Sequence, residues 1–272
     1  MTLIAILIGT LAAGIGSVWL AAALSFGVLA RYTQHMLSLA AGALLGTAFL
    51  HLLPEAFESG IAPGSLFLTL LVGVVFFFLL DKAELWHHGH EHHHDAGDSE
   101  AHAGHAHGHH GHAHPHAHAH GPMAGGWTVL AGDSVHCFGD GILIASAFMA
   151  DLRLGVIAAV AVLAHEVPHH MGDLTVLRES SGTRRAALLK VTLAGAITAL
   201  GGVVGYWLVD LLHDYLTYFL VVASGSFIYV ALADLIPQLQ KRLTLRETLA
   251  QIGWLLAGIV LVTLASSVAH TH

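Results

Sequence analysis

Long apolar stretches divide the chain into eight segments, each close to the length that crosses a membrane. A membrane-spanning helix needs about 20 predominantly apolar residues. Such windows cover residues 2–30, 35–57, 64–81, 125–150, 153–177, 191–210, 214–236 and 249–268. The pattern predicts an all-α integral membrane protein with eight transmembrane helices. We expect the first helix to be retained, because it is longer than a signal-peptide core and no Lys or Arg precedes Arg31.

The composition agrees with a body that lies in a bilayer. Hydrophobic residues make up 55% of the 272 residues and charged residues 10%, with a mean hydropathy of +0.70, whereas soluble proteins contain about 25% charged residues. The single cysteine, Cys137, excludes a disulfide framework. A net charge of −8 with 10 Lys and Arg residues leaves no basic surface for nucleic acid.

The basic residues predict an orientation, because cytoplasmic connections are rich in Lys and Arg. If both termini lie outside, Arg153 is the one basic residue on the outer side. The remaining Lys and Arg residues then lie in or beside cytoplasmic connections, and they are Arg31, Lys82, Arg178, Arg184, Arg185, Lys190, Lys241, Arg242 and Arg246. We therefore expect extracytoplasmic termini.

A histidine-rich segment separates two groups of predicted helices. Residues 1–86 hold the first three helices, residues 87–124 form a cytoplasmic loop, and residues 125–272 hold the last five. The loop has no apolar face, so we expect it to be disordered without metal. Neutral imidazole binds Zn, Cu, Ni and Fe, which predicts metal binding; an inert linker is the alternative. Its histidines are His87, His88, His90, His92, His93, His94, His102, His105, His107, His109, His110, His112, His114, His116, His118 and His120.

Two predicted helices carry ionisable side chains that are unfavourable inside a bilayer. Helical spacing puts the polar residues of the fourth helix on one face. The polar residues of the fifth helix form stacked rows, and a short connection should make the two helices antiparallel neighbours. We expect a His/carboxylate site for one or two divalent transition metals; hydrogen bonding between the helices without metal is the alternative. The candidate ligands are His136, Cys137, Asp140, His165, Glu166, His169 and His170.

Further polar residues are candidates for an ion pathway. His51 and Glu55 end the second helix on the predicted outer side, where they could recruit a cation. Asp234 lies near the inner end of the seventh helix, and Asp133 and Asp173 flank the candidate ligands.

These segments resemble the signatures of the ZIP (Zrt/Irt-like protein) family of divalent metal transporters. His-Cys-Phe-Gly-Asp-Gly at 136–141 is similar to the family's fourth-helix signature, His-Asn-Phe-x-Asp-Gly. His-Glu-Val-Pro-His-His-Met-Gly-Asp at 165–173 is similar to the fifth-helix signature, His-Glu-x-Pro-His-Glu-x-Gly-Asp. His-Leu-Leu-Pro-Glu at 51–55 and Ala-Asp-Leu-Ile-Pro at 233–237 agree as well. The resemblance covers the whole chain and implies a ZIP-like helix bundle with a binuclear site midway across the membrane.

The resemblance also implies roles for single residues. By position, one metal would be held by His136, Asp140, His165 and His169. Cys137 and Glu166 match positions of the second metal, with Asp140 as a bridge between the two. Cys137 stands where Asn is usual and His170 where Glu is common, and these softer ligands favour Zn²⁺ or Cd²⁺ over Mn²⁺. Fe²⁺ is a further candidate.

The prediction is therefore a transporter, not an enzyme, that moves Zn²⁺, with up to two ions bound, into the cytoplasm. We expect it in a cell membrane, namely a bacterial inner membrane. The expected partners are divalent metal ions and the lipid bilayer, and a homodimer is left open. A metal exporter of the cation-diffusion-facilitator kind is the first alternative. Such exporters have six spans and a soluble C-terminal domain, for which no room follows a helix ending near residue 268.

A second alternative is an intramembrane metalloprotease. His165-Glu166-Val167-Pro168-His169 also reads as H-E-x-x-H, in which Glu acts as the general base of a zinc protease. Pro168 has no N–H to offer the carbonyl of Ala164, so we expect it to disrupt the helix that would place both histidines.

Overall fold

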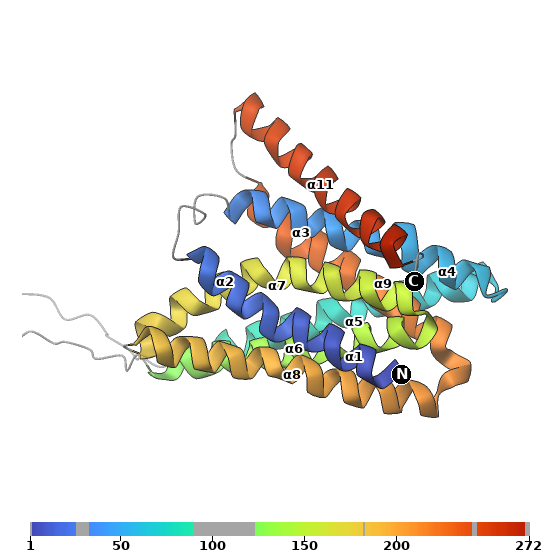
Figure 1. Ribbon diagram of the computed structural model, residues 1–272, viewed down its shortest axis with the longest axis horizontal. Helices are drawn as coiled ribbons and strands as arrows, with labels where there is room; N and C mark the ends of the chain where they lie inside the picture. The colour runs from blue at the N-terminus through green and yellow to red at the C-terminus, as the bar shows by residue number, and fades with distance from the viewer. Residues whose placement is uncertain (1, 26–32, 90–122, 182, 241–243, 270–272) are drawn as a thin grey trace, which may run out of the picture.

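The protein is a bundle of long helices, most of which run along a common axis, with the last helix inclined to the others (Figure 1). This computed structural model describes residues 2–25, 33–89, 123–181, 183–240 and 244–269, and no strand occurs among them. The elements are α1 (Thr2–Leu11), η1 (Ala12–Gly16), α2 (Ser17–Ser25), α3 (Thr33–Thr47), η3 (Ala48–Leu52), α4 (Leu53–Glu58), α5 (Pro63–Gly89), α6 (Met123–Ala150), α7 (Leu152–Ser181), α8 (Arg184–Leu211), η5 (His213–Tyr215), α9 (Leu216–Tyr229), η6 (Val230–Leu235), α10 (Ile236–Leu239) and α11 (Leu245–Ala269).

The predicted all-α membrane fold is confirmed. Each of the eight predicted spans is found as a helical stretch, the first, second and seventh built from several elements in succession. Within the described residues, seven of these stretches are long and apolar enough to cross a membrane. The exception is α6, which carries Asp133, His136 and Asp140. The beginning of α1 and the end of α11 lie at the same end of the bundle (Figure 1), as an even number of spans requires.

The helices around the histidine-rich segment extend further than predicted. Helix α5 continues through His87 and His88 to Gly89, and α6 begins at Met123. The remaining loop histidines, between residues 90 and 120, lie outside the described residues, as do Arg31, Lys241 and Arg242.

Helix α7 is not interrupted at Pro168, so the expected disruption is wrong. The α-helix runs from Leu152 to Ser181 with the proline inside it. Proline removes one N–H from the hydrogen-bond ladder, and α7 is supported along its length by α2, α3, α6, α8 and α11. The continuous helix keeps the polar residues before and after Pro168 in register.

Small residues let the site-bearing helices pack backbone to backbone. Helix α6 packs most extensively against α8. A Cβ atom at Gly141 would collide with the carbonyl oxygen of Thr198, and one at Gly201 with the carbonyl oxygen of Phe138. Glycine is therefore required at this crossing, which is the close approach that small residues allow between helices in lipid.

Peripheral helices present apolar side chains outward. Exposed large residues on α5 include Phe67, Leu68 and Phe76, and those on α11 include Leu249, Leu256 and Leu264. So much exposed apolar surface is compatible with lipid rather than with water. Helix α7 packs against α2, α3, α6, α8 and α11, and its polar residues His165, Glu166 and His170 are buried.

Candidate metal site

Helices α6 and α7 carry a concentration of ionisable side chains inside the bundle. A single residue, Asp151, separates the end of α6 from the start of α7, so the two helices are neighbours that pack against each other. The polar positions of each helix share one face, and the packing brings these faces together. The residues that meet are Asp133, His136, Cys137, Asp140, His165, Glu166 and His170.

The first group, which we call the histidine cluster, consists of His136, Asp140, His165 and Glu166. The four ligand atoms all lie within 4.8 Å of one another. The Nε2 of His165 lies 3.2 Å from Asp140 Oδ2 and 3.4 Å from His136 Nε2. Glu166 Oε1 lies 3.4 Å from His136 Nε2 and 3.7 Å from His165 Nε2. A tetrahedral zinc ion with bonds of about 2.1 Å separates its ligands by about 3.4 Å, so these atoms have the spacing of a zinc site.

The second group, which we call the cysteine cluster, consists of Asp133, Cys137, Glu166 and His170. His170 Nε2 lies 3.1 Å from Glu166 Oε2 and 3.7 Å from Asp133 Oδ1. The Sγ of Cys137 lies 3.7 Å from the same Asp133 oxygen. One nitrogen, one sulfur and two carboxylates form a softer donor set than that of the histidine cluster.

Glu166 belongs to both clusters. Its Oε1 faces His136 and His165, whereas its Oε2 faces His170. The side chain is 1% exposed, and neither oxygen accepts a hydrogen bond. The geometry thus gives the shared position to Glu166, whereas the family resemblance had implied Asp140.

The protons of the histidine cluster can be located from its hydrogen bonds. His165 Nδ1 lies 3.3 Å from the carbonyl oxygen of Ala161. A carbonyl oxygen can only accept, so Nδ1 carries the proton of a neutral ring and Nε2 presents a lone pair. That lone pair faces Asp140 Oδ2, a buried oxygen that accepts no hydrogen bond. Two acceptors at 3.2 Å require a cation between them, either a metal ion or a proton.

The same reasoning shows which ring nitrogen of His170 carries the proton, through a hydrogen bond to Ser17 of the first span. The hydroxyl of Ser17 donates its one proton to the carbonyl oxygen of Gly14, 2.6 Å away. Towards His170 Nδ1, at 2.9 Å, Ser17 Oγ can therefore only accept. Nδ1 then carries the ring proton, and the Nε2 lone pair is directed at Glu166. Ser17 and His170 are both fully buried, so this chain of hydrogen bonds is shielded from water.

His169 lies outside both clusters, although the family resemblance placed it among the ligands. Its Nε2 lies 2.9 Å from Asp234 Oδ2 on η6, and Gln238 donates to the other Asp234 oxygen at 2.9 Å. The His169 ring is nevertheless near the histidine cluster, with its centroid 5.4 Å from that of His136. The pair with Asp234 holds His169 beside the cluster.

The other pathway candidates lie at different depths. Asp133 is a member of the cysteine cluster, and Asp173 is half-buried farther along α7. His51 is buried, and its Nε2 has no hydrogen-bond partner. Glu55 is exposed on α4.

Among the residues that the structure describes, π-helical turns occur in three spans, and they were not predicted from the sequence. The π-helical elements η1, η3 and η6 contain or directly precede Ser17, His51 and Asp234. Two of them are followed closely by a proline, Pro54 or Pro237, and π turns are frequent at functional sites. Pro54 and Pro237 are signals in the sequence that could have indicated an irregular helix. No signal in the sequence linked Ser17 to His170, which is 153 residues away.

Comparison with known proteins identifies relatives over the whole chain. The family described as ZIP Zinc transporter matches residues 1–266. Zinc transporter ZIP13 of Pongo abelii is 28% identical over 291 residues, which cover 97% of this chain and 79% of that protein.

Two other relatives match a shorter part of the chain. Zinc transporter ZIP10 of Danio rerio is 35% identical over 113 residues, and zinc transporter ZIP4 of Homo sapiens is 36% identical over 115 residues. Each match covers 42% of this chain but 13% and 18% of those proteins. The matched part of the chain thus spans less than a fifth of the length of ZIP10 and of ZIP4. All three relatives are animal proteins, so they give no support to the expected bacterial inner membrane.

Proposed function

The chain belongs to the ZIP zinc transporter family, and we propose that it carries Zn²⁺ across a membrane through the two clusters between α6 and α7. Members of this family are transporters and not enzymes. The observation that carries the proposal is the pair of facing acceptors in the histidine cluster, His165 Nε2 and Asp140 Oδ2. A site that needs a cation, and whose ligands have tetrahedral zinc spacing, is suited to bind the ion.

The two clusters provide for two ions that share Glu166. Three carboxylates (Asp133, Asp140 and Glu166) and the thiolate that Cys137 forms on binding metal supply four negative charges. Two divalent cations balance that charge, so a doubly loaded site avoids a buried net charge. The sulfur and imidazole donors also accommodate Cd²⁺, and Fe²⁺ is a further candidate.

Release requires ligands that hold the ion less tightly than a closed thiolate cage does. In the histidine cluster every donor is imidazole or carboxylate, each of which can take up a proton when the metal leaves. His169 and Asp234, bonded to each other beside the cluster, form the next pair of groups along the route. Asp173 follows farther along α7.

We propose that metal enters near His51 and Glu55 and leaves towards the histidine-rich loop. The support is the distribution of basic residues, which puts the loop and the Arg178–Lys190 region in the cytoplasm. The unpartnered Nε2 of buried His51 offers an intermediate ligand on the entry side. The loop histidines would then lower the concentration of free ion after release. A cell membrane is the proposed location, and assembly as a homodimer is left open.

The two alternative functions are not favoured. The H-E-x-x-H reading requires His165 and His169 to bind one ion, but His169 Nε2 is bonded to Asp234 and His169 belongs to neither cluster. The exporter alternative loses support because the family match extends over residues 1–266.

Metal flux into proteoliposomes that hold the purified full chain tests the proposal. We expect wild type to transport ⁶⁵Zn²⁺ down its gradient and His165→Ala to lose about 90% or more of that flux, because removal of a ligand dismantles the histidine cluster. His213→Ala is the matched control, since His213 is highly exposed and pairs with its neighbour Asp214. Equal flux in wild type and His165→Ala would refute the central site, and absence of flux in wild type would refute zinc transport.

A further inference from the structure

A hydroxyl group without a hydrogen bond is buried in α8, beside the cysteine cluster. Three threonines are buried among the described residues, namely Thr10, Thr47 and Thr198. The first two donate to the carbonyl oxygen four residues earlier in their own helices, at 2.7 and 2.9 Å. The Oγ1 of Thr198 has no hydrogen-bond partner, although the residue is 1% exposed. Buried polar groups are seldom left unpaired, so the exception at Thr198 requires a reason.

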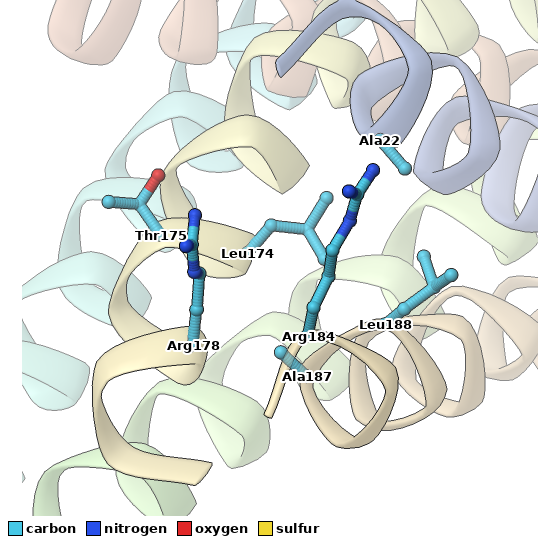
Figure 2. A pocket seen from close by; sticks show the side chains of 7 residues that line it. All are labelled: Ala22, Leu174, Thr175, Arg178, Arg184, Ala187 and Leu188. Atoms are coloured by element: carbon cyan, nitrogen blue, oxygen red, sulfur yellow. The ribbon is translucent and has the colours of Figure 1, made fainter. Parts of the chain in front are cut away.

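The first span and α8 are in backbone contact beside this hydroxyl. A Cβ atom at Gly14 would collide with the carbonyl oxygen of Gly195 and would lie 2.6 Å from Thr198 Oγ1. Farther along the first span, Ala22 and Ala187 help to line a cavity of about 100 Å³ (Figure 2). Ala187 is eleven residues before Thr198 on α8, which is about 16 Å along the helix. A water molecule in that cavity would therefore be out of reach of the hydroxyl.

The sulfur of Cys137 lies on the side of α6 that meets Thr198. Helices α6 and α8 are in backbone contact at Gly141, where a Cβ atom would collide with the carbonyl oxygen of Thr198. Cys137 precedes Gly141 by four residues, so both lie on the same face of α6. Cys137 is fully buried, and the Thr198 hydroxyl is close enough to act on its sulfur as a side-chain donor. The unpaired donor and the sulfur therefore face each other.

The strength of this contact depends on the protonation of Cys137. As a thiol, Cys137 directs its own proton to Asp133 Oδ1 at 3.7 Å, and a thiol sulfur is a weak acceptor. A metal ion binds the thiolate form, whose sulfur is negatively charged. Because a charged acceptor forms a stronger hydrogen bond, Thr198 gains a full partner when Cys137 becomes a metal ligand.

We propose that Thr198 is a positioning residue of the cysteine cluster, which donates its hydroxyl proton to the Cys137 thiolate when that thiolate binds a metal ion. The inference rests on the proposed metal site and adds a group that acts through one of its ligands. A hydrogen bond to the sulfur fixes its direction and stabilises its negative charge in a buried site.

The proposed role parallels that of Ser17, which orients His170. Both hydroxyls lie beside Gly14, since Ser17 donates to its carbonyl oxygen and Thr198 occupies the space that a side chain at Gly14 would fill. The nitrogen and the sulfur of the cysteine cluster would then each be held by a hydroxyl group from a different span.

Titration of the purified full chain with Co²⁺, at free concentrations set by a metal buffer, tests the proposal. Co²⁺ bound to a thiolate has a sulfur-to-metal charge-transfer band in the near ultraviolet. Cys137 is the single cysteine, so the histidine-rich loop cannot contribute to this band. Thr198→Val keeps the shape of the side chain and removes the donor.

We expect two changes in Thr198→Val. The half-saturating Co²⁺ concentration should rise by about tenfold, because the ligand loses its orienting partner. The band should also move to longer wavelength, because the sulfur lone pairs are no longer stabilised by a hydrogen bond. A role of Thr198 in packing alone would not shift the band.

Three further variants separate the hydrogen bond from packing. Thr10→Val removes another buried threonine hydroxyl, which is bonded within its own helix, and it should change neither the band nor the half-saturating concentration. Thr198→Ser keeps the donor and should retain the wild-type band position. Thr198→Ala removes the donor and should shift the band as Thr198→Val does.

The outcomes distinguish this inference from the proposed function. Thr198→Val with the wild-type band position and half-saturating concentration would overturn the inference and leave the proposed metal site standing. An equal shift in Thr10→Val, or the same shift in Thr198→Ser as in Thr198→Val, would also overturn it, since packing would then account for the change. A wild-type chain that binds Co²⁺ without a charge-transfer band would refute the cysteine cluster itself, and the inference with it.

Discussion

The histidine cluster and the cysteine cluster share Glu166 but are held in place by different parts of the fold. The histidine cluster is complete within the α6–α7 pair, and the carbonyl of Ala161 in α7 itself orients His165. The cysteine cluster also depends on the first span, because Ser17 orients His170. A shift of the first span relative to α7 would therefore disturb the second cluster and leave the first intact.

The two clusters also differ in the donor atoms that they offer to a metal ion. Two imidazoles and two carboxylates form the histidine cluster, which suits a zinc ion that must be released. The sulfur of Cys137 makes the other cluster softer. We infer that the histidine cluster determines whether metal is transported and that the cysteine cluster determines which metal is preferred. The following experiments test this division.

The largest effect is expected from Glu166→Gln, because this variant removes a ligand charge from both clusters without changing shape. We expect ⁶⁵Zn²⁺ flux in proteoliposomes to fall by about 100-fold or more, as two divalent ions would then share one negative charge fewer in a buried site. Glu58→Gln, a change of the same kind at an exposed position on α4, should leave the flux unchanged. A Glu166→Gln variant with half of the wild-type flux would show that neither cluster needs the shared carboxylate.

Ser17→Ala should weaken the cysteine cluster selectively. Without the hydroxyl, His170 can turn its protonated nitrogen towards Glu166, and loss of such an orienting partner weakens metal binding by about tenfold or more. The measurement is the concentration dependence of flux for Cd²⁺ and Zn²⁺, with the larger change expected for Cd²⁺.

Two comparisons separate orientation from simple packing at Ser17. Ser146→Ala removes another fully buried hydroxyl, which is bonded to a carbonyl of its own helix. This variant should leave the concentration dependence of flux unchanged for both Cd²⁺ and Zn²⁺. Ser17→Thr keeps an acceptor and should restore part of the Cd²⁺ affinity. If Ser17→Ala changed the concentration dependence of Cd²⁺ and Zn²⁺ flux equally, or changed neither, as expected for Ser146→Ala, the orienting role of Ser17 would be refuted.

Cys137→Asn should change preference more than rate. Replacement of a sulfur donor by an amide oxygen makes the cysteine cluster harder, so we expect the ratio of Cd²⁺ flux to Zn²⁺ flux to fall by about threefold to tenfold. Cys137→Ser, which also removes the sulfur, should act in the same direction. An unchanged ratio in both variants would mean that the thiol is not a ligand.

The smallest effect is expected from Asp234→Asn. His169 and Asp234 are each more than a third exposed, and an exposed ion pair contributes about 0.2–1 kcal/mol. We therefore expect the apparent KM for zinc to change by no more than about fivefold. A fall in ⁶⁵Zn²⁺ flux as large as that expected for Glu166→Gln would place Asp234 among the primary ligands.

Much of the fold was predictable because membrane-spanning helices can be recognised from the length and hydropathy of their sequences. The windows located every helical stretch, and the 3.6-residue period put His136 and Asp140 on the face that meets His165. The ends of helices were less predictable, since α5 and α8 continue beyond their apolar windows into polar residues. Backbone hydrogen bonds continue a helix through polar residues, so a hydropathy window ends before the helix does.

The rest of the site depends on contacts between distant segments. Pairing of Ser17 with His170 joins the first and fifth spans, and pairing of His169 with Asp234 joins the fifth and seventh. Neither pair has a periodic signature in the sequence. Pro168 was misjudged because a single missing N–H was weighed without the packing that surrounds α7.

Anomalous X-ray diffraction at the zinc edge, from crystals of the full chain grown with Zn²⁺, tests the central claim most directly. Equilibrium titration is less suitable, because the loop histidines would bind zinc as well. The account predicts two peaks, one on each side of the Glu166 carboxylate. The first should lie about 2.1 Å from the ligand atoms of His165 and Asp140, and the second about 2.1 Å from His170 and 2.3 Å from Cys137. A single peak between His169 and Asp234, with none between α6 and α7, would contradict it.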